Sequence, residues 1–203
     1  MTVALQGRRI AILAMDGVEQ SELEQPRRAL DDAGAMTHLI GPVEGSIQAM
    51  NHDAQGSRIP VDRTLAEARP GDYDALLLPG GVANPDQLRM NERAVQFVRE
   101  FMLADKPVGA ICHAPWMLVE ADAVAGRTLT SWPSLQTDIR NAGGKWVDEE
   151  VQIDDRLITS RKPQDLPAFC AAIVREFARD VGSSRVESVR PPRDVAVAPS
   201  FAV

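Results

Sequence analysis

The sequence predicts an α/β domain with a mostly parallel sheet and helices on both faces. Short apolar runs alternate with segments of helical periodicity through most of the 203 residues. The apolar runs do not alternate with polar residues, which is typical of strands buried on both faces. Strands that alternate with helices favour a parallel sheet, because a parallel connection needs a crossover segment.

Each strand is predicted where an apolar run ends at a breaker such as Gly17 or Pro79. Asp154 and Asp155 separate the last two runs and indicate a hairpin. The expected strands are 10–15, 36–40, 73–78, 108–111, 127–131, 146–153 and 156–160, with short strands around Ile47 and Ile59.

Helices are predicted from apolar residues that recur at three- and four-residue spacing. The first helix, 21–33, contains Pro26, which either kinks the helix or lies near its start. A second helix carries Ala94, Phe97, Val98, Phe101 and Met102 on one face, a third covers 113–123, and the last carries Leu166, Phe169, Cys170, Ile173, Val174 and Phe177.

Composition indicates a globular protein with an acidic surface. Hydrophobic residues make up 44% of the chain, and the formal net charge is −7. This charge disfavours nucleic acid and anionic membranes as partners. No apolar run approaches the ~20 residues that span a bilayer, and no signal-peptide pattern is present. We therefore expect a cytoplasmic protein, with one domain over 1–180 and an extended tail over 181–203 that has no periodicity.

Cys112 is the strongest candidate for a reactive residue. It ends a predicted buried strand, begins a helix and is flanked two positions away by Ala110 and Ala114. A nucleophile elbow needs small residues at these positions, because the turn is tight and strained. The helix N-terminus favours a thiolate there. Cys170 lies on an apolar helical stripe and is expected to be a core residue.

Other groups near the predicted elbow could support the thiol. Gly80 and Gly81 end a neighbouring strand and could offer backbone N–H groups to a substrate oxygen, or simply form a tight turn. Glu19 follows the first strand and could act as an acid or base, or be a helix-terminal charge. His113 is the obvious base, but adjacent residues on a helix do not face each other, so it could also turn toward another subunit.

The sequence disfavours cofactor chemistry. It has no phosphate loop, paired Cys-x-x-Cys or His-Glu-x-x-His motif, and a metal at Cys112, His113 and Glu19 has no support from ligand spacing. We expect no metal or cofactor. A glutamine-amidotransferase triad needs a histidine far beyond the cysteine, and none follows His113.

The segment Ala110–Pro115 resembles the cysteine elbow of the PfpI-type intracellular protease branch of the ThiJ/PfpI superfamily, which also contains the Parkinson-linked protein deglycase. The resemblance covers about residues 8–180. It also rests on the segments 16–23, 77–81, 130–133 and 141–144.

This resemblance implies a flavodoxin-like sandwich that forms homodimers or larger rings. It implies Cys112 as the nucleophile and Glu19 as the carboxyl beside it. In protease-like members, a glutamate of the adjacent subunit orients the histidine, and the nearest acid here is Asp86, which is one carbon shorter. Ala114 stands where the family usually has glycine.

Three functions follow as hypotheses, all in stress defence. In the first, Cys112 attacks methylglyoxal or its early adducts, which is glyoxalase- or deglycase-type chemistry. In the second, the protein is a cysteine peptidase that needs His113 oriented by an acid. In the third, it is a non-enzymatic sensor or chaperone whose Cys112 oxidises to a sulfinate beside Glu19.

Overall fold

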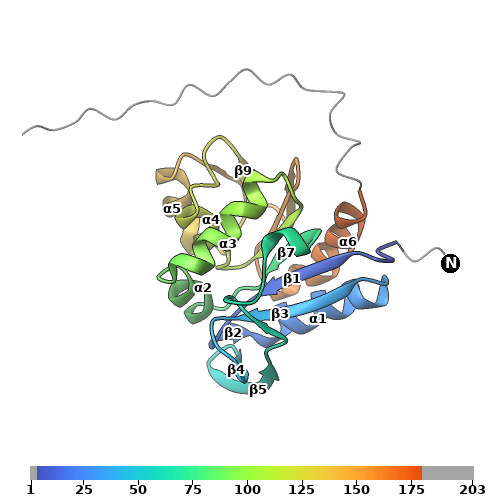
Figure 1. Cartoon of the computed structure of the whole chain (residues 1–203). Helices are drawn as coiled ribbons and strands as arrows, with labels where there is room; N and C mark the ends of the chain where they lie inside the picture. Colours follow the sequence, from blue (N-terminus) through green and yellow to red (C-terminus); the bar gives the residue numbers. More distant parts are fainter. Residues whose placement is uncertain (1–3, 180–203) are drawn as a thin grey trace, which may run out of the picture.

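The computed structural model describes residues 4–179 and contains a seven-stranded sheet in the order β11-β12-β8-β7-β1-β3-β6 (Figure 1). Every pairing within it is parallel except that of the edge strand β11 with β12. The predicted α/β fold is therefore confirmed. Its strands are β1 (Arg9–Leu13), β3 (Met36–Gly41), β6 (Arg63–Thr64), β7 (Ala75–Leu78), β8 (Val108–Ile111), β11 (Val151–Asp154) and β12 (Leu157–Ser160).

Two hydrophobic cores sandwich this sheet, because alternate residues of each strand point to opposite faces. Ile10 and Ile12 of β1 belong to the cluster formed with helices α1 and α6, whereas Ala11 and Leu13 belong to the cluster formed with α3 and α4. Figure 1 shows these helix pairs on opposite sides of the sheet. The helices are α1 (Gln20–Asp32), α2 (Ala83–Leu88), α3 (Glu92–Leu103), α4 (Pro115–Glu120), α5 (Gln136–Asn141) and α6 (Leu166–Phe177).

A small second sheet lies beside the carboxyl end of β1. It consists of β2 (Val18–Glu19), β4 (Ser46–Asn51) and β5 (Ala54–Pro60), and the last two strands form an antiparallel hairpin. The strands predicted around Ile47 and Ile59 are thus present. The Gly17 N–H donates to the Gln48 carbonyl at 2.9 Å, which holds the hairpin against the end of the main sheet.

Some local predictions were wrong. The strand predicted at 127–131 is only β9 (Thr128–Leu129), which pairs with β10 (Lys145–Trp146) outside the main sheet. Trp146 therefore does not belong to the predicted hairpin, which is formed by β11 and β12 alone. Pro26 lies inside α1, and the helix predicted at 113–123 is limited to Pro115–Glu120. The predicted tail, 181–203, lies outside the described residues.

Gly109 in β8 allows α6 to approach the sheet closely. A Cβ atom at this position would lie 2.9 Å from Ile173 Cγ2 and 3.4 Å from the ring of Phe169. We expect Gly109→Ala to destabilise the protein by roughly 1–3 kcal/mol through overpacking. The measurement is the thermal unfolding midpoint, with Gly71→Ala as the control, because a Cβ there would meet nothing within 4 Å. Equal midpoints for the two variants would contradict this account of the packing.

Candidate active site

Cys112 lies on a strained turn between β8 and α4. Its φ is 63°, a left-handed conformation that side chains other than glycine rarely adopt. Two backbone hydrogen bonds hold the turn, from the Cys112 N–H to the Ser160 carbonyl at 3.0 Å and from the Trp132 N–H to the Cys112 carbonyl at 2.8 Å. The structure therefore has the sharp strand-to-helix turn expected of an elbow. Ala114 has φ −56° and ψ −30°, so this position does not need glycine.

The carboxyl beside the sulfur is that of Glu22. Glu22 is 0% exposed, and its Oε2 accepts a hydrogen bond from the Gly80 N–H at 3.0 Å. The same carboxyl lies beside the Cys112 side chain, across the space that Gly80 leaves open, and the two groups influence each other's pKa. Oε1 is also buried and has no hydrogen-bond partner within residues 4–179.

Glu19 was predicted in this place, and that placement is wrong. Glu19 ends β2 and directs its carboxylate toward the β4–β5 hairpin, where it accepts from Ser21 Oγ at 3.1 Å and from the His52 N–H at 3.0 Å. It lines the same pocket as Cys112. Glu22, one helical turn later, shares the buried face of α1 with Leu23, Pro26 and Leu30. The sequence signal that could have identified Glu22 is an acidic residue on a helix face that is otherwise apolar.

His113 contacts the sulfur despite being the next residue in the chain. Its Nδ1 lies 3.1 Å from Cys112 Sγ. The left-handed turn at Cys112 brings the two side chains together, which a regular helix would not do. The imidazole stacks on Trp132, with ring centroids 5.7 Å apart, and its Nε2 lies 3.5 Å from Ser134 Oγ. Burial lowers the pKa of His113 to about 4, so the ring is neutral at physiological pH.

Gly80 and Gly81 have different roles from one another. The Gly80 N–H already donates to Glu22, so it is not free to bind a substrate oxygen. The N–H groups of Gly81 and His113 face the Cys112 sulfur instead. A Cβ on Gly80 would lie 2.5 Å from Glu22 Oε2 and 2.7 Å from Cys112 Cβ, so only glycine fits between the two groups.

Asp86 is not brought to the site within this chain. It lies on the exposed side of α2, and the pocket residues described in the structure do not include it. Its neighbour Asn84, which the sequence did not single out, is buried and fixes the Pro79–Gly80 turn. Asn84 Nδ2 donates to both carbonyls of this turn, at 2.9 and 3.0 Å, and Oδ1 accepts from the Met15 N–H at 2.8 Å.

Burial dominates the electrostatics of the Cys112–Glu22 pair. Burial, together with the smaller effect of the negative charge of Glu19, raises the pKa of Glu22 to about 8. Burial and the Glu22 carboxyl raise the pKa of the Cys112 thiol above its ordinary value, although the N–H groups of Gly81 and His113 oppose this. The two groups titrate as a pair, and at neutral pH both hold a proton.

The pair opens into a pocket of about 520 Å³ at the carboxyl edge of the sheet, where open α/β folds bind ligands. Met50 and His52 from the β4–β5 hairpin form one wall. Trp132 and Pro163 form another. The volume suits a small molecule.

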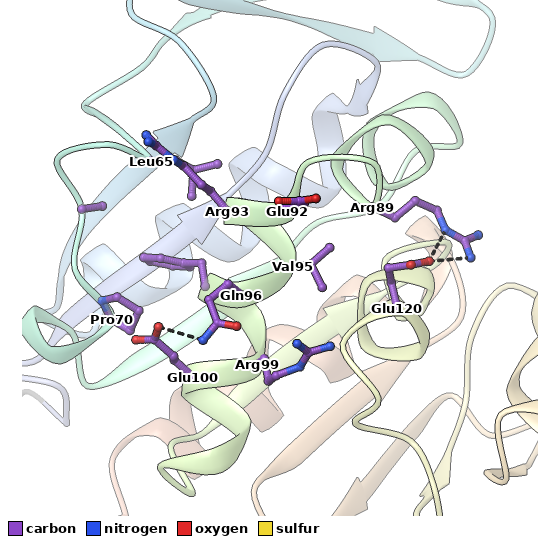
Figure 2. A pocket seen from close by; sticks show the side chains of 12 residues that line it. Leu65, Pro70, Arg89, Glu92, Arg93, Val95, Gln96, Arg99, Glu100 and Glu120 are labelled. Atoms are coloured by element: carbon purple, nitrogen blue, oxygen red, sulfur yellow. Dashed lines mark hydrogen bonds and ion pairs between the residues drawn. The ribbon is translucent and has the colours of Figure 1, made fainter. Parts of the chain in front are cut away.

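A second pocket, of about 680 Å³, lies along α3 on another face (Figure 2). Several of its side chains pair with one another, as Arg89 does with Glu120 at 3.1 Å and Gln96 with Glu100 at 3.1 Å. Its lining includes no cysteine, histidine, serine or threonine. The pocket that contains a cysteine and a histidine is therefore the one at Cys112.

Residues 4–179 contain no group of three or more His, Cys, Asp or Glu side chains that could hold a metal ion. No helix in the same range is long and apolar enough to cross a bilayer.

The DJ-1/PfpI family model matches residues 8–176, which include the elbow, Glu22 and the Pro-Gly-Gly turn. The chain belongs to the DJ-1/PfpI family. General stress protein 18 of Bacillus subtilis is 41% identical to this family member over 165 residues, which are 80% of this chain and 94% of the relative.

Solved structures share the fold of this DJ-1/PfpI protein. Drosophila melanogaster DJ-1beta superimposes with a TM-score of 0.76 and 28% identity, over 84% of this chain and 90% of the other. A two-domain protein from Anabaena variabilis, with DJ-1/ThiJ/PfpI-like and ferritin-like domains, has a TM-score of 0.78 and 34% identity. The match covers 83% of this chain and 47% of that longer protein.

The coupled pair predicts how the reactivity of Cys112 depends on pH. We expect alkylation by iodoacetamide, measured in a Cys170→Ala background, to rise around pH 8 as the pair loses its first proton. In Glu22→Gln that step should disappear. In Glu19→Gln it should move to lower pH, because the charge that raises the pKa of Glu22 is gone. If Glu22→Gln kept the profile of the unsubstituted protein, the coupling would be disproved.

The same shift predicts a stability cost. The folded-state pKa of Glu22, about 8, lies above the ordinary value of 4.5, so the folded state loses stability as pH rises from 4.5 to about 8. Glutamine does not ionise. Glu22→Gln should therefore melt at a higher temperature than the unsubstituted protein at about pH 8, and the gap should shrink toward pH 4.5. A gap in melting temperature that is independent of pH would contradict the shift.

Proposed function

We propose that this protein is a cysteine-dependent enzyme, a hydrolase or lyase, that converts small reactive carbonyls such as methylglyoxal to hydroxy acids. The contact of the Cys112 thiol with the Glu22 carboxyl in a small pocket carries this proposal. The thiol of Cys112 can act as a nucleophile, and the Glu22 carboxyl beside it can act as a proton donor. A carboxyl with a pKa of about 8 can both give and take protons near neutral pH. The relative named as a general stress protein agrees with a role in stress defence.

The proposed reaction begins with attack of Cys112 Sγ on the aldehyde carbon. The thiol proton moves to His113 Nδ1, which lies 3.1 Å from the sulfur, and the aldehyde oxygen takes the proton of Glu22. The product is a neutral hemithioacetal, beside a Glu22 carboxylate and a His113 imidazolium. Covalent capture of this kind divides one difficult step into easier ones.

An internal redox step then moves the oxidation level from one carbon to the next. The Glu22 carboxylate removes the proton from the former aldehyde carbon, and His113 protonates the neighbouring carbonyl oxygen, which gives an enediol. Glu22 returns its proton to the second carbon while His113 takes the proton of the first hydroxyl, which gives a thioester. Water then cleaves the C–S bond: its hydroxyl joins the acyl carbon, its proton goes to Glu22, and His113 reprotonates the sulfur.

The contact between Cys112 and His113 favours a second candidate, a cysteine peptidase, because it brings together a nucleophile and a base. A peptidase would also need an acid that orients His113, and Asp86 of a second copy of the chain is the residue for that role. The group at His113 Nε2 in this chain is the Ser134 hydroxyl. Cleavage of a fluorogenic peptide that Asp86→Ala abolishes would favour the peptidase.

Lactate formation from methylglyoxal is the direct test of the proposal. We expect turnover that Cys112→Ala abolishes and that Glu22→Gln lowers by at least about a hundredfold, the usual contribution of general acid–base catalysis. Cys170→Ala is the matched control, because Cys170 packs against the core and away from the pocket. Retention of activity in Cys112→Ala, or its absence from the pure protein, would end the proposal.

A further inference from the structure

The Cys112 pocket carries an unusual set of charges. Of its described lining residues, three are carboxyl-bearing, namely Glu19, Glu22 and Asp53, and none is lysine or arginine. Glu19 is 8% exposed, so water screens its charge only in part. Its influence on Glu22 shows that its field reaches the group beside the sulfur. The other titratable groups of the described lining are Cys112, His113 and His52, whose Nδ1 lies 4.0 Å from Glu19 Oε2.

The basic side chains of residues 4–179 lie elsewhere. Arg161 is the nearest arginine in sequence to the rim residue Pro163, but it is bound to Asp148 at 2.7 Å and Asp165 at 2.8 Å. Lys162 precedes Pro163 and does not line the pocket. Arg89, Arg93 and Arg99 gather around the second pocket, along α3 (Figure 2). Among residues 4–179, no lysine or arginine lines the pocket to offset Glu19 and Asp53.

We infer that this pocket selects uncharged or cationic carbonyl substrates and rejects anionic ones such as α-keto acids and phosphorylated aldehydes. The inference rests on the proposed function for its substrate class, and on the acidic lining for its selectivity. A cleft lined by charge of one sign changes the local concentration of charged ligands by a factor of about 10 or more.

The apolar part of the lining fits the same substrates. Met50 and Val82 offer contact to an uncharged carbonyl, and Val82 is 58% exposed at the rim. The indole of Trp132 lines the pocket and is 38% exposed, and an aromatic ring attracts a cation such as the ammonium or guanidinium group of a modified amine. An anionic substrate would find no partner for its charge among these side chains.

Two alkylating reagents of nearly equal size test the selectivity without requiring turnover. Iodoacetamide is neutral and iodoacetate is anionic, and in both cases the Cys112 thiolate forms the S–C bond and iodide leaves. In a Cys170→Ala background at about pH 8, where imidazoles are mostly neutral, mass spectrometry gives the two rates. For Cys112, we expect the ratio of the iodoacetamide rate to the iodoacetate rate to be about tenfold or more above the same ratio for 2-mercaptoethanol, an uncharged free thiol.

Charge-neutralising variants identify the source of that ratio. Glu19→Gln and Asp53→Asn should each lower it severalfold, and added salt should lower it further by screening. Glu92→Gln is the matched control, because it removes the same charge from the α3 surface, at the second pocket. If Glu92→Gln lowered the ratio as much as Glu19→Gln, the overall charge of the protein and not the pocket would be responsible, and the inference would fail.

Glyoxylate separates this inference from the proposed function. It is an anionic aldehyde close in size to methylglyoxal, and we expect it not to inhibit lactate formation at concentrations similar to those of the substrate. If methylglyoxal is not turned over but the alkylation ratio is high, the proposed function fails and the selectivity stands. The selectivity would be overturned if the ratio of iodoacetamide to iodoacetate rates equalled that of the free thiol. It would also be overturned if glyoxylate inhibited lactate formation at concentrations similar to those of methylglyoxal.

Discussion

The contact between a buried carboxyl and a buried thiol determines how this site is built. Neither group would be stable as an isolated anion at this depth, since burial raises the pKa of Glu22 and of Cys112 alike. Because each group keeps its proton at neutral pH, neither has to be buried as an anion there. The surrounding structure serves this contact: Gly80 leaves room for it and donates to Glu22, and Asn84 fixes the turn that carries Gly80.

The contact also links reactivity with strain. Cys112 reaches Glu22 and His113 from a left-handed backbone conformation, which costs on the order of 1–3 kcal/mol. Backbone hydrogen bonds to Ser160 and Trp132 hold that conformation from both sides of the chain. The central strands supply the rigidity, because β8 lies between β7 and β12 and is buried along its whole length. The site is thus maintained at the expense of stability that the two cores provide.

Much of the fold could be predicted from the sequence, because continuous apolar runs such as those at β1, β7 and β8 have few other interpretations. The position of Cys112 on a tight strand-to-helix turn was also predictable, since small residues flank it, whereas Cys170 lies on an apolar helical stripe. The carboxyl partner was predicted one helical turn too early. Glu19 and Glu22 both follow the first strand, and only the position at which α1 begins, Gln20, decides which of them faces the elbow. The contact of His113 with the sulfur depends on a positive φ that no sequence pattern specified.

The site depends on a protonated Glu22 carboxyl, and its protonation state can be measured. Infrared difference spectroscopy of the protein with ¹³C-labelled glutamate, with Glu22→Gln to assign the band, follows the carbonyl stretch of a protonated carboxyl against pH. The account predicts a Glu22 band that persists through neutral pH and disappears around pH 8. A Glu22 carboxyl that ionises near its ordinary value of 4.5 would contradict the account, because the thiol would then lie beside a full negative charge.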